Sequence, residues 1–557
     1  QRPVLPDFPG PDAKVSDYQR SLVFAYPSSG QADVAPGSPI VLRFSHAIAP
    51  ESRFPATEFP VGTTLKSLFT VKAKAASAGV DFDISLVNGG LGLLLKPTAP
   101  LQEKTEYQIL APKKIPVLLG DNTVGMITLP PLSFTTRAAI EGPSELQKLT
   151  PAFQVAQMTP TPTGFLMGSQ PFGLVDFSTI RLLMTQPIDT RSVRYGAGPT
   201  NTISLMQGST LVPARVIVQG SHLSIDPEQD LDPSKSYTLS LNTGLKSVLG
   251  QALVPGNYAA FSFTPQDSGI STGKSSKIAV AVPDPAQNEL SLLLGSAANQ
   301  APVLSPILGS GNLLKLKQGQ LLADLALPSN FAKYNPVVTP LRVPRGNTLT
   351  AAPLVVTLNG GLVSGLNTDD LTISLISDAN GLLLPNRYSS STVAPALVML
   401  ELDINVTAKN PTSSGAFTQD ITHVQVAGIA SVDVFVKQNT QMLTIEAVGT
   451  IELKVLGVDN AVALLALKLQ TDLTQAPTAS SPDEISPTIA SWVPGDIVNG
   501  LPGGEFIRPG DPVIVNFSEA MDIKSLQQPG AITLMKGSAA EPFSWRMDGA
   551  SLIVTPD

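Results

Sequence analysis

The sequence contains no cysteine and few residues suited to catalysis. The absence of cysteine excludes thiol nucleophiles, disulfides and cysteine-ligated zinc. Only three histidines and two tryptophans occur in 557 residues. Charged residues make up 14% of the chain, against a usual share of about 25%, and no basic block accompanies the net charge of −8. The sequence therefore argues against nucleic acid as a partner. It also lacks the run of about 18 apolar residues that a membrane-spanning helix requires.

Proline and glycine are abundant instead, at 50 and 44 residues. This composition is typical of short strands joined by tight turns rather than of long helices. A chain of 557 residues exceeds one hydrophobic core, so roughly three to five domains are expected. The first residue is Gln1 rather than methionine, which fits the removal of an export signal and equally fits a sequence trimmed at its start. The predicted location is therefore extracellular or at a bacterial cell surface.

A thirteen-residue pattern occurs twice, as PGSPIVLRFSHAI at 36–48 and PGDPVIVNFSEAM at 509–521. In both copies apolar residues alternate with polar ones, as in a strand with one buried face. The stretch TIRLLMTQPIDTRSV at 179–193 repeats the pattern a third time. The three copies predict homologous structural units.

Two further sequence anchors follow these copies. LLLKPTAPLQEKTEY at 93–107 and LSIDPEQDLDPSKSY at 223–237 share two leucines, one proline and a final tyrosine in the same spacing. LIVTPD at 552–557 matches the beginning of the same anchor. LSFTT at 132–136 and FSFTP at 261–265 close the first two units. Because the missing N–H of proline ends a strand ladder, each second anchor predicts a strand that stops at its proline.

These anchors resemble the bacterial Ig-like domains that occur in tandem in surface-layer proteins, adhesins and stalks of secreted enzymes. The resemblance covers about 20–137, 152–266 and 487–557. It implies antiparallel sandwiches of about seven strands. It also implies that Tyr107 and Tyr237 are corner tyrosines, whose hydroxyls bond to nearby backbone.

We predict an all-β chain, a string of Ig-like antiparallel β-sandwiches with one larger, divergent β-sandwich domain, joined by short linkers. The predicted parts are an N-terminal extension at 1–19, Ig-like domain 1 at 20–140, Ig-like domain 2 at 150–268, a divergent β-sandwich domain at 275–475 with an insertion near 285–345, and Ig-like domain 4 at 485–557. In the divergent domain, imperfect alternation indicates strands buried on both faces, and 314–327 is the one stretch expected to form a short helix. Domain 4 looks incomplete, since its tyrosine and phenylalanine anchors would follow residue 557. We therefore expect the native chain to continue, or another chain to supply the missing strands.

No catalytic or cofactor-binding residue is predicted, and the chain is not expected to be an enzyme. His46, His222 and His423 are each expected on a solvent-exposed or strand surface. GISTG at 269–273 matches the nucleophile elbow G-x-S-x-G, but that motif requires a strand-to-helix turn. Here it lies in an expected linker, so chance accounts for the match.

No metal or cofactor is predicted, with Ca²⁺ as the one alternative. The weak candidates for it are Asp226, Glu228, Asp230 and Asp232. Calcium needs about six converging oxygens, and the equivalent turn of the first unit carries only one acidic residue. The sequence therefore favours a solvated turn over a calcium site at these four residues. Trp545 either stacks on a sugar or packs in a core.

The sequence thus predicts a non-catalytic extracellular structural or adhesive protein, such as a stalk, an adhesin or a filament subunit. Its expected partners are further copies of itself, or a polysaccharide or protein of a cell surface or host. The alternative is the N-terminal accessory region of a secreted hydrolase whose catalytic domain lies beyond residue 557.

Overall fold

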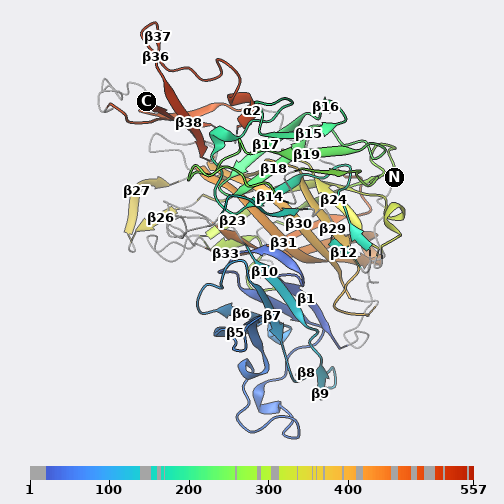
Figure 1. Cartoon of the computed structure of the whole chain (residues 1–557). Coiled ribbons are helices and arrows are strands. Elements are labelled where there is room, and N and C mark those ends of the chain that lie inside the picture. Colours follow the sequence, from blue (N-terminus) through green and yellow to red (C-terminus); the bar gives the residue numbers. More distant parts are fainter. Residues whose placement is uncertain are drawn as a thin grey trace.

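The fold is a barrel with β-sandwiches packed on its outside, seen in a computed structural model of the whole chain (Figure 1). The structure describes residues 20–137, 152–159, 165–167, 170–256, 260–284, 290–302, 313–334, 337–353, 355–358, 361–367, 370–391, 394–408, 418–452, 462–477, 486–494, 509–517, 521–548 and 551–557. The described residues are mostly in strands, which confirms the predicted all-β class. None of their helices has both the length and the apolar character needed to cross a membrane.

The N-terminal sandwich (residues 20–137) consists of two four-stranded sheets and a hairpin. The first sheet has the order β1 (Leu22–Tyr26), β3 (Ile40–Phe44), β6 (Gly92–Pro97) and β5 (Phe82–Val87). The second has the order β2 (Gln31–Val34), β10 (Leu132–Thr136), β7 (Glu106–Leu110) and β4 (Thr70–Ala73). β8 (Ile115–Leu118) pairs with β9 (Val124–Ile127), and the short 3-10 helices are η2 (Glu51–Arg53), η3 (Lys66–Leu68) and η4 (Asn88–Gly90).

The second sandwich (described residues of 152–263) repeats this plan. Its sheets have the orders β11 (Val155–Thr159), β14 (Ile180–Met184), β18 (His222–Pro227), β17 (Ala214–Gln219), and β16 (Thr210–Leu211), β15 (Ile203–Gln207), β19 (Tyr237–Leu241), β20 (Ala260–Phe263). The remaining elements are the pair β12 (Phe165–Met167) and β13 (Gln170–Phe172) and the 3-10 helix η5 (Thr190–Ser192). The first sheet therefore has the same strand order in both sandwiches.

The C-terminal sheet has that order a third time. It runs β34 (Ile489–Val493), β35 (Val513–Phe517), β39 (Ser551–Pro556) and β38 (Phe543–Asp548). The hairpin β36 (Met535–Lys536) and β37 (Ala539–Ala540) and the short helix α2 (Ile523–Leu526) accompany it. The sequence repeat is thus a repeat of topology. Whether further strands complete this unit stays a prediction.

The predicted anchors recur because they pack on one another. The ring of Tyr107 stacks on Phe134 and that of Tyr237 on Phe263, with centroids 5.9 Å apart in each pair. Each tyrosine hydroxyl accepts a hydrogen bond from the backbone N–H five residues earlier, at 2.9 and 2.8 Å. The predicted corner tyrosines are therefore confirmed, and so are the strand ends at the three anchor prolines.

A closed barrel occupies residues 276–472. Its strands are β21 (Ser276–Ala281), β22 (Gln300–Pro302), β23 (Leu313–Leu325), β24 (Thr339–Val343), β25 (Thr348–Ala351), β28 (Leu371–Leu375), β29 (Ala379–Leu384), β30 (Ala396–Ala408), β31 (Thr418–Phe435), β32 (Thr440–Glu452) and β33 (Val462–Asp472). A side hairpin, β26 (Val355–Leu358) and β27 (Gly361–Asn367), and the 3-10 helices η7 (Pro328–Phe331) and η8 (Val436–Gln438) complete the region.

The barrel closes because the long strand β23 is paired along both edges. One edge pairs with β21 and β22, which both pair with β33. The other edge pairs with β24 and β25, which lead through β29 and β28 to β30. The circuit holds eight strands, so the larger region is a barrel and not the sandwich that the sequence predicted. The helix predicted for 314–327 is also wrong, because alternate burial along β23 suits a strand with one face in the barrel.

The barrel strands are buried on both faces, as their imperfect alternation predicted. Even-numbered side chains of β30, such as Val398 and Ile404, join the inner cluster, whose buried members are all Ile, Val, Leu or Ala. Odd-numbered ones such as Leu397 join an outer apolar cluster. The parity follows from the period of two in a strand.

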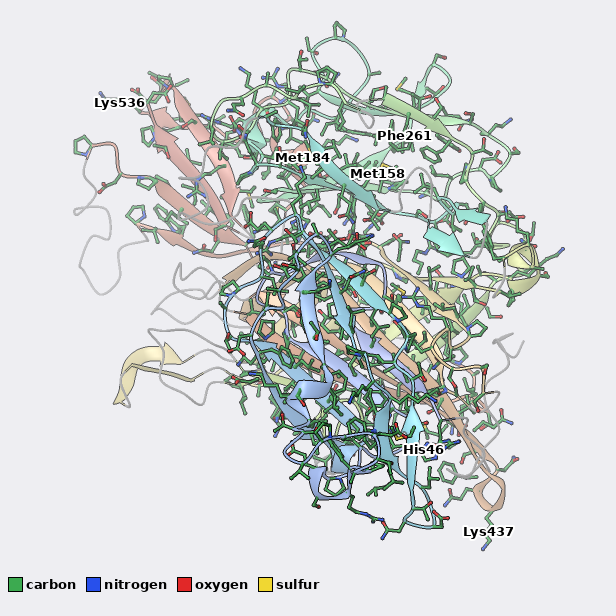
Figure 2. All side chains as sticks on the ribbon, turned by 60° about the horizontal axis from the view of Figure 1, so that its bottom comes forward. His46, Met158, Met184, Phe261, Lys437 and Lys536 are labelled. Atoms are coloured by element: carbon green, nitrogen blue, oxygen red, sulfur yellow. The ribbon has the colours of Figure 1, made fainter. Side chains whose placement is uncertain are left out.

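The outer cluster joins the barrel to the N-terminal sandwich. Phe24, Tyr26 and Val41 of that sandwich pack with Ile429 and Val448 of the barrel, and all five are buried. Figure 1 shows the barrel between the two sandwiches, with the C-terminal sheet beside the second one. The sandwiches are therefore not separate units on linkers, because apolar surface on the barrel covers them. Hairpin tips project from the body of the molecule, such as those marked by Lys437 and Lys536 in Figure 2.

Candidate functional site

A buried ionic junction joins the second sandwich to the barrel. Arg181 extends from β14, with only 5% of its side chain exposed. Its Nη2 donates hydrogen bonds to Ser377 Oγ (2.9 Å) and to the backbone oxygen of Asp378 (2.7 Å), and its Nε lies 3.3 Å from Asp403 Oδ2. The equivalent strand position in the N-terminal sandwich is Val41, which packs on the barrel through apolar contact. The two sandwiches thus use one repeat position for docking, with opposite chemistry.

Asp403 is the centre of this junction. Its Oδ2 also accepts hydrogen bonds from Ser224 Oγ and Ser377 Oγ, both at 2.7 Å, and its Oδ1 lies 3.0 Å from His423 Nδ1. Burial alone would raise the pKa of the Asp403 carboxyl, but Arg181 and His423 outweigh burial and hold that pKa well below its usual range. Asp403 therefore remains a carboxylate although its side chain is 3% exposed.

The structure separates the four carboxylates considered for calcium, Asp226, Glu228, Asp230 and Asp232. Asp226 Oδ2 lies 3.1 Å from Arg345 Nη1, and Asp230 pairs with Arg342. Asp232 accepts from backbone and hydroxyl groups within its own turn, and Glu228 is exposed. Two of the four are thus ion-pair partners of barrel arginines, and the turn does not bring all four together.

Asp378 adds to the junction a carboxyl whose charged form is destabilised. Burial and, after it, the nearby Asp226 carboxylate raise the pKa of Asp378 to about 6. Arg342 and Arg345 oppose this shift, and their guanidinium nitrogens lie 3.5 and 4.0 Å from the Asp378 oxygens. The junction is therefore sensitive to weakly acidic pH.

Two of the three histidines meet where both sandwiches reach the barrel. The rings of His222 (β18) and His423 (β31) stack with centroids 4.7 Å apart. His423 Nε2 lies 2.9 Å from Glu401 Oε1, and His222 Nε2 lies 3.3 Å from Asp33 Oδ2. Their side chains are 6% and 15% exposed, so the prediction of exposed histidines is wrong for this pair. Burial alone would lower the pKa of His423, but the carboxylates of Asp403 and Glu401 raise it to about 10.

The third histidine lies apart from this pair. His46 is buried in the N-terminal sandwich, where its Nδ1 lies 2.8 Å from Ser45 Oγ, so it is not exposed either. Figure 2 shows it far from Met158 and Met184 of the second sandwich. Burial and the charge of Arg20 lower its pKa, which favours a neutral, structural imidazole.

One group of residues within the described part of the chain has the spacing of a metal site. The donor atoms of Asp33, His222 and His423 all lie within 4.8 Å of one another. Sequence reasoning missed this group because its members are hundreds of residues apart. The available signal was a departure from the repeat, since the strand that begins with His222 begins with Gly92 and Ser551 in the other units.

The remaining candidates occupy structural positions. GISTG forms a turn between β20 and β21, with Gly269 at a φ of +83°, and it leads into a strand rather than a helix. Trp545 packs against the apolar core of the second sandwich. It lines a cavity of about 620 Å³ between that sandwich and the C-terminal sheet, together with Tyr195 and Lys524.

Comparison with known proteins agrees with the fold. Residues 19–136 and 150–265 match the family of the bacterial Ig-like domain. The N-terminal and second sandwiches are therefore tandem bacterial Ig-like domains, as their sequence anchors predicted. The C-terminal sheet shares their strand order. Domains of this family indicate a structural or surface protein.

One relative extends beyond these two domains. The chain is 30% identical over 570 residues to Alkane uptake protein B of Marinobacter nauticus (strain ATCC 49840 / DSM 8798 / CIP 103578 / SP17). The match includes 96% of this chain and 50% of that protein, so the chain spans about half the length of this relative.

Solved structures show only weak similarity. L,D-transpeptidase 3 from Mycobacterium tuberculosis is 11% identical, with 43% of this chain and 92% of that chain covered and a TM-score of 0.14. An S-layer protein is 8% identical, with 95% and 62% covered and a TM-score of 0.14. Similarity at these TM-scores supports no further structural argument.

Proposed function

We propose that this chain is the non-catalytic, surface-exposed part of a bacterial uptake system for long-chain apolar compounds such as alkanes. Its Ig-like domains would brace the barrel, and the barrel would bind the apolar chain. The observation that carries this proposal is the barrel interior, whose buried cluster consists of Ile, Val, Leu and Ala. Eight-stranded barrels are either filled by side chains or hold one small ligand.

Two further observations support an uptake role over that of a flexible stalk. The sandwiches are fixed to the barrel by the outer apolar cluster and by the Arg181 junction, so they do not serve as independent spacers. In addition, the chain is related over nearly its whole length to a protein named for alkane uptake. Neither observation requires a catalytic group.

Binding of radiolabelled n-hexadecane to the purified chain tests this proposal. We expect saturable binding of about one molecule per chain. Ala447→Leu, which adds volume inside the barrel, is expected to weaken binding at least about tenfold, because overpacking removes the space for a ligand. Ala332→Leu adds the same volume at an exposed position and serves as the matched control.

A second candidate function is the structural or adhesive role that Ig-like domains alone favour. If hexadecane does not bind, or if both leucine variants bind it equally well, the uptake role is rejected and the structural role is favoured. Sedimentation of the purified chain with purified cell-wall polysaccharide, or with itself at rising concentration, then identifies the partner.

A further inference from the structure

Residues from all three large units meet at one buried point. Asp33 comes from β2 of the N-terminal sandwich and His222 from β18 of the second sandwich. Glu401 and His423 come from the adjacent barrel strands β30 and β31. Their side chains are 15% exposed or less. Because histidine occurs only three times in the chain, two histidines at one interface form a concentration of nitrogen ligands that packing does not require.

The distances between the donor atoms suit a tetrahedral metal ion. Bonds of about 2.0–2.1 Å from zinc to nitrogen and oxygen place neighbouring ligand atoms about 3.3 Å apart. Here Asp33 Oδ2 lies 3.3 Å from His222 Nε2 and 3.8 Å from His423 Nε2. His423 Nε2 lies 2.9 Å from Glu401 Oε1. The donor atoms of Asp33, His222 and His423 all lie within 4.8 Å of one another, so they can occupy three corners of a tetrahedron, whereas Glu401 lies outside this group.

Two independent features of Asp33 indicate a bound ligand. Its φ is +59°, a left-handed conformation that is uncommon outside glycine, and the pairing of β2 with β10 shifts register at this position. Its Oδ1 is buried and has no hydrogen-bond partner. Backbone strain and an unsatisfied buried oxygen are both costly, and they are expected together where a ligand compensates for them.

The surroundings of His423 resemble the outer shell of a metal site. A metal-bound histidine usually donates its other ring N–H to a carboxylate, which fixes the tautomer and the ring orientation. His423 Nδ1 has such a partner in Asp403 Oδ1, at 3.0 Å. Asp403 is itself held by Arg181 and Ser377. The ring is therefore oriented with Nε2 toward Asp33 and Glu401.

Both ring nitrogens of His423 face carboxylates, so either a second ring proton or a metal ion must supply positive charge at Nε2. A neutral imidazole donates only one hydrogen bond, and its second nitrogen would face Glu401 lone pair to lone pair. A second ring proton would relieve that contact but would leave Asp33 Oδ1 without a partner. A metal ion solves both problems. It places positive charge at Nε2 of His423, and it can be coordinated by Nε2 of His222 and by one or both carboxylate oxygens of Asp33.

We propose that Asp33, His222 and His423 bind one divalent transition metal, with Zn²⁺ as the best fit, and that this ion clamps both sandwiches to the barrel. Two imidazoles favour zinc over calcium or magnesium, which prefer oxygen ligands. The three ligands come from the two sandwiches and the barrel and are covered at the interface, so a bound ion would hold these three units together. The ion therefore has an assembly role, independent of what the barrel binds.

Metal binding to the purified whole chain tests this proposal. The chain is stripped with EDTA, dialysed and titrated with ZnSO₄, with bound zinc counted by mass spectrometry of the metal. We expect one zinc per chain, and a rise in the melting temperature on addition of zinc that EDTA reverses. Co²⁺ in place of zinc should give the strong visible absorption of a tetrahedral site.

Matched histidine variants locate the site. His222→Gln is expected to lower zinc affinity at least about 100-fold, whereas His46→Gln, at the buried histidine outside the site, should keep one zinc per chain. If His222→Gln does not fold, Asp33→Asn replaces it, since it keeps the shape of the side chain. The proposal is overturned if the folded wild-type chain binds no zinc at excess metal, or if the two histidine variants lose zinc equally.

Discussion

Replacing Arg181 by methionine tests whether the ionic junction fixes the second sandwich to the barrel. The substitution keeps most of the side-chain length but removes every hydrogen bond to Ser377, Asp378 and Asp403. Asp403 then remains buried as a carboxylate without its arginine. Removing one partner of a buried ion pair costs about 3–5 kcal/mol, because the other charge is left uncompensated. We expect Arg181→Met to lower the free energy of unfolding by that amount.

Urea unfolding followed by far-ultraviolet circular dichroism measures this loss, with amide hydrogen exchange to localise it. Exchange should accelerate in β14, β18 and β30 and remain unchanged in the distant strands β8 and β9. Arg191→Met is the matched control, since Arg191 pairs with Asp189 in the same sandwich but is 61% exposed. Exposed pairs contribute little, so this variant should lose less than about 1 kcal/mol.

A double variant separates the ion pair from simple packing. Arg181→Met combined with Asp403→Asn removes both charges, so its loss should be smaller than the sum of the two single losses by at least about 1 kcal/mol. A loss below about 1 kcal/mol in Arg181→Met, or strict additivity in the double variant, would refute the view that this ion pair holds the junction together.

Three more predictions concern separate parts of the fold. Tyr107→Phe and Tyr237→Phe should each lower the free energy of unfolding by about 1–2 kcal/mol, because each leaves a corner N–H without its acceptor. Gly428→Ala should cost about 3 kcal/mol, because a Cβ there would clash with the backbone oxygen of Glu446 in the next barrel strand. Asp378 has a raised pKa of about 6, so the folded state holds its proton more tightly than the unfolded state does. Its contribution of about 3 kcal/mol is fully present below about pH 4 and is lost as the pH rises through 6.

Each of these predictions has its own control. The two tyrosine losses should add in the double variant because the residues lie in different sandwiches, and strong non-additivity would contradict the corner role. Gly120→Ala, where no atom lies within 4 Å of the added Cβ, should be neutral. Urea unfolding at several pH values should show that the free energy of unfolding changes less between pH 4 and 6 in Asp378→Asn than in the wild-type chain. An unchanged slope would assign the pH dependence to other groups.

Local sequence signals were sufficient for the repeated units. Period-two alternation located β3, β14 and β35, and the anchor prolines located the ends of β6, β18 and β39. The corner tyrosines followed from the resemblance of these anchors to bacterial Ig-like domains. These features involve residues close together in sequence, where strand period and turn chemistry act directly.

The helix expected at 314–327 shows where local reasoning stops. Leu314 and Leu316 alternate with exposed residues as in a strand, but the run of apolar residues from Leu321 onward equally suits a helix. Pairing with four partner strands decided in favour of β23. The same long-range pairing closed the barrel, which no local pattern encodes.

The sequence by itself determined the all-β class, the tandem Ig-like domains and the scarcity of catalytic groups, because composition and spacing are properties of the chain. Only the tertiary structure decided that the sandwiches are docked on a barrel and that Asp33, His222 and His423 meet. Alternation shows which face of a strand is covered but not what covers it. The identity of the covering surface depends on contacts between residues hundreds of positions apart, and the candidate metal site exists only where those surfaces meet.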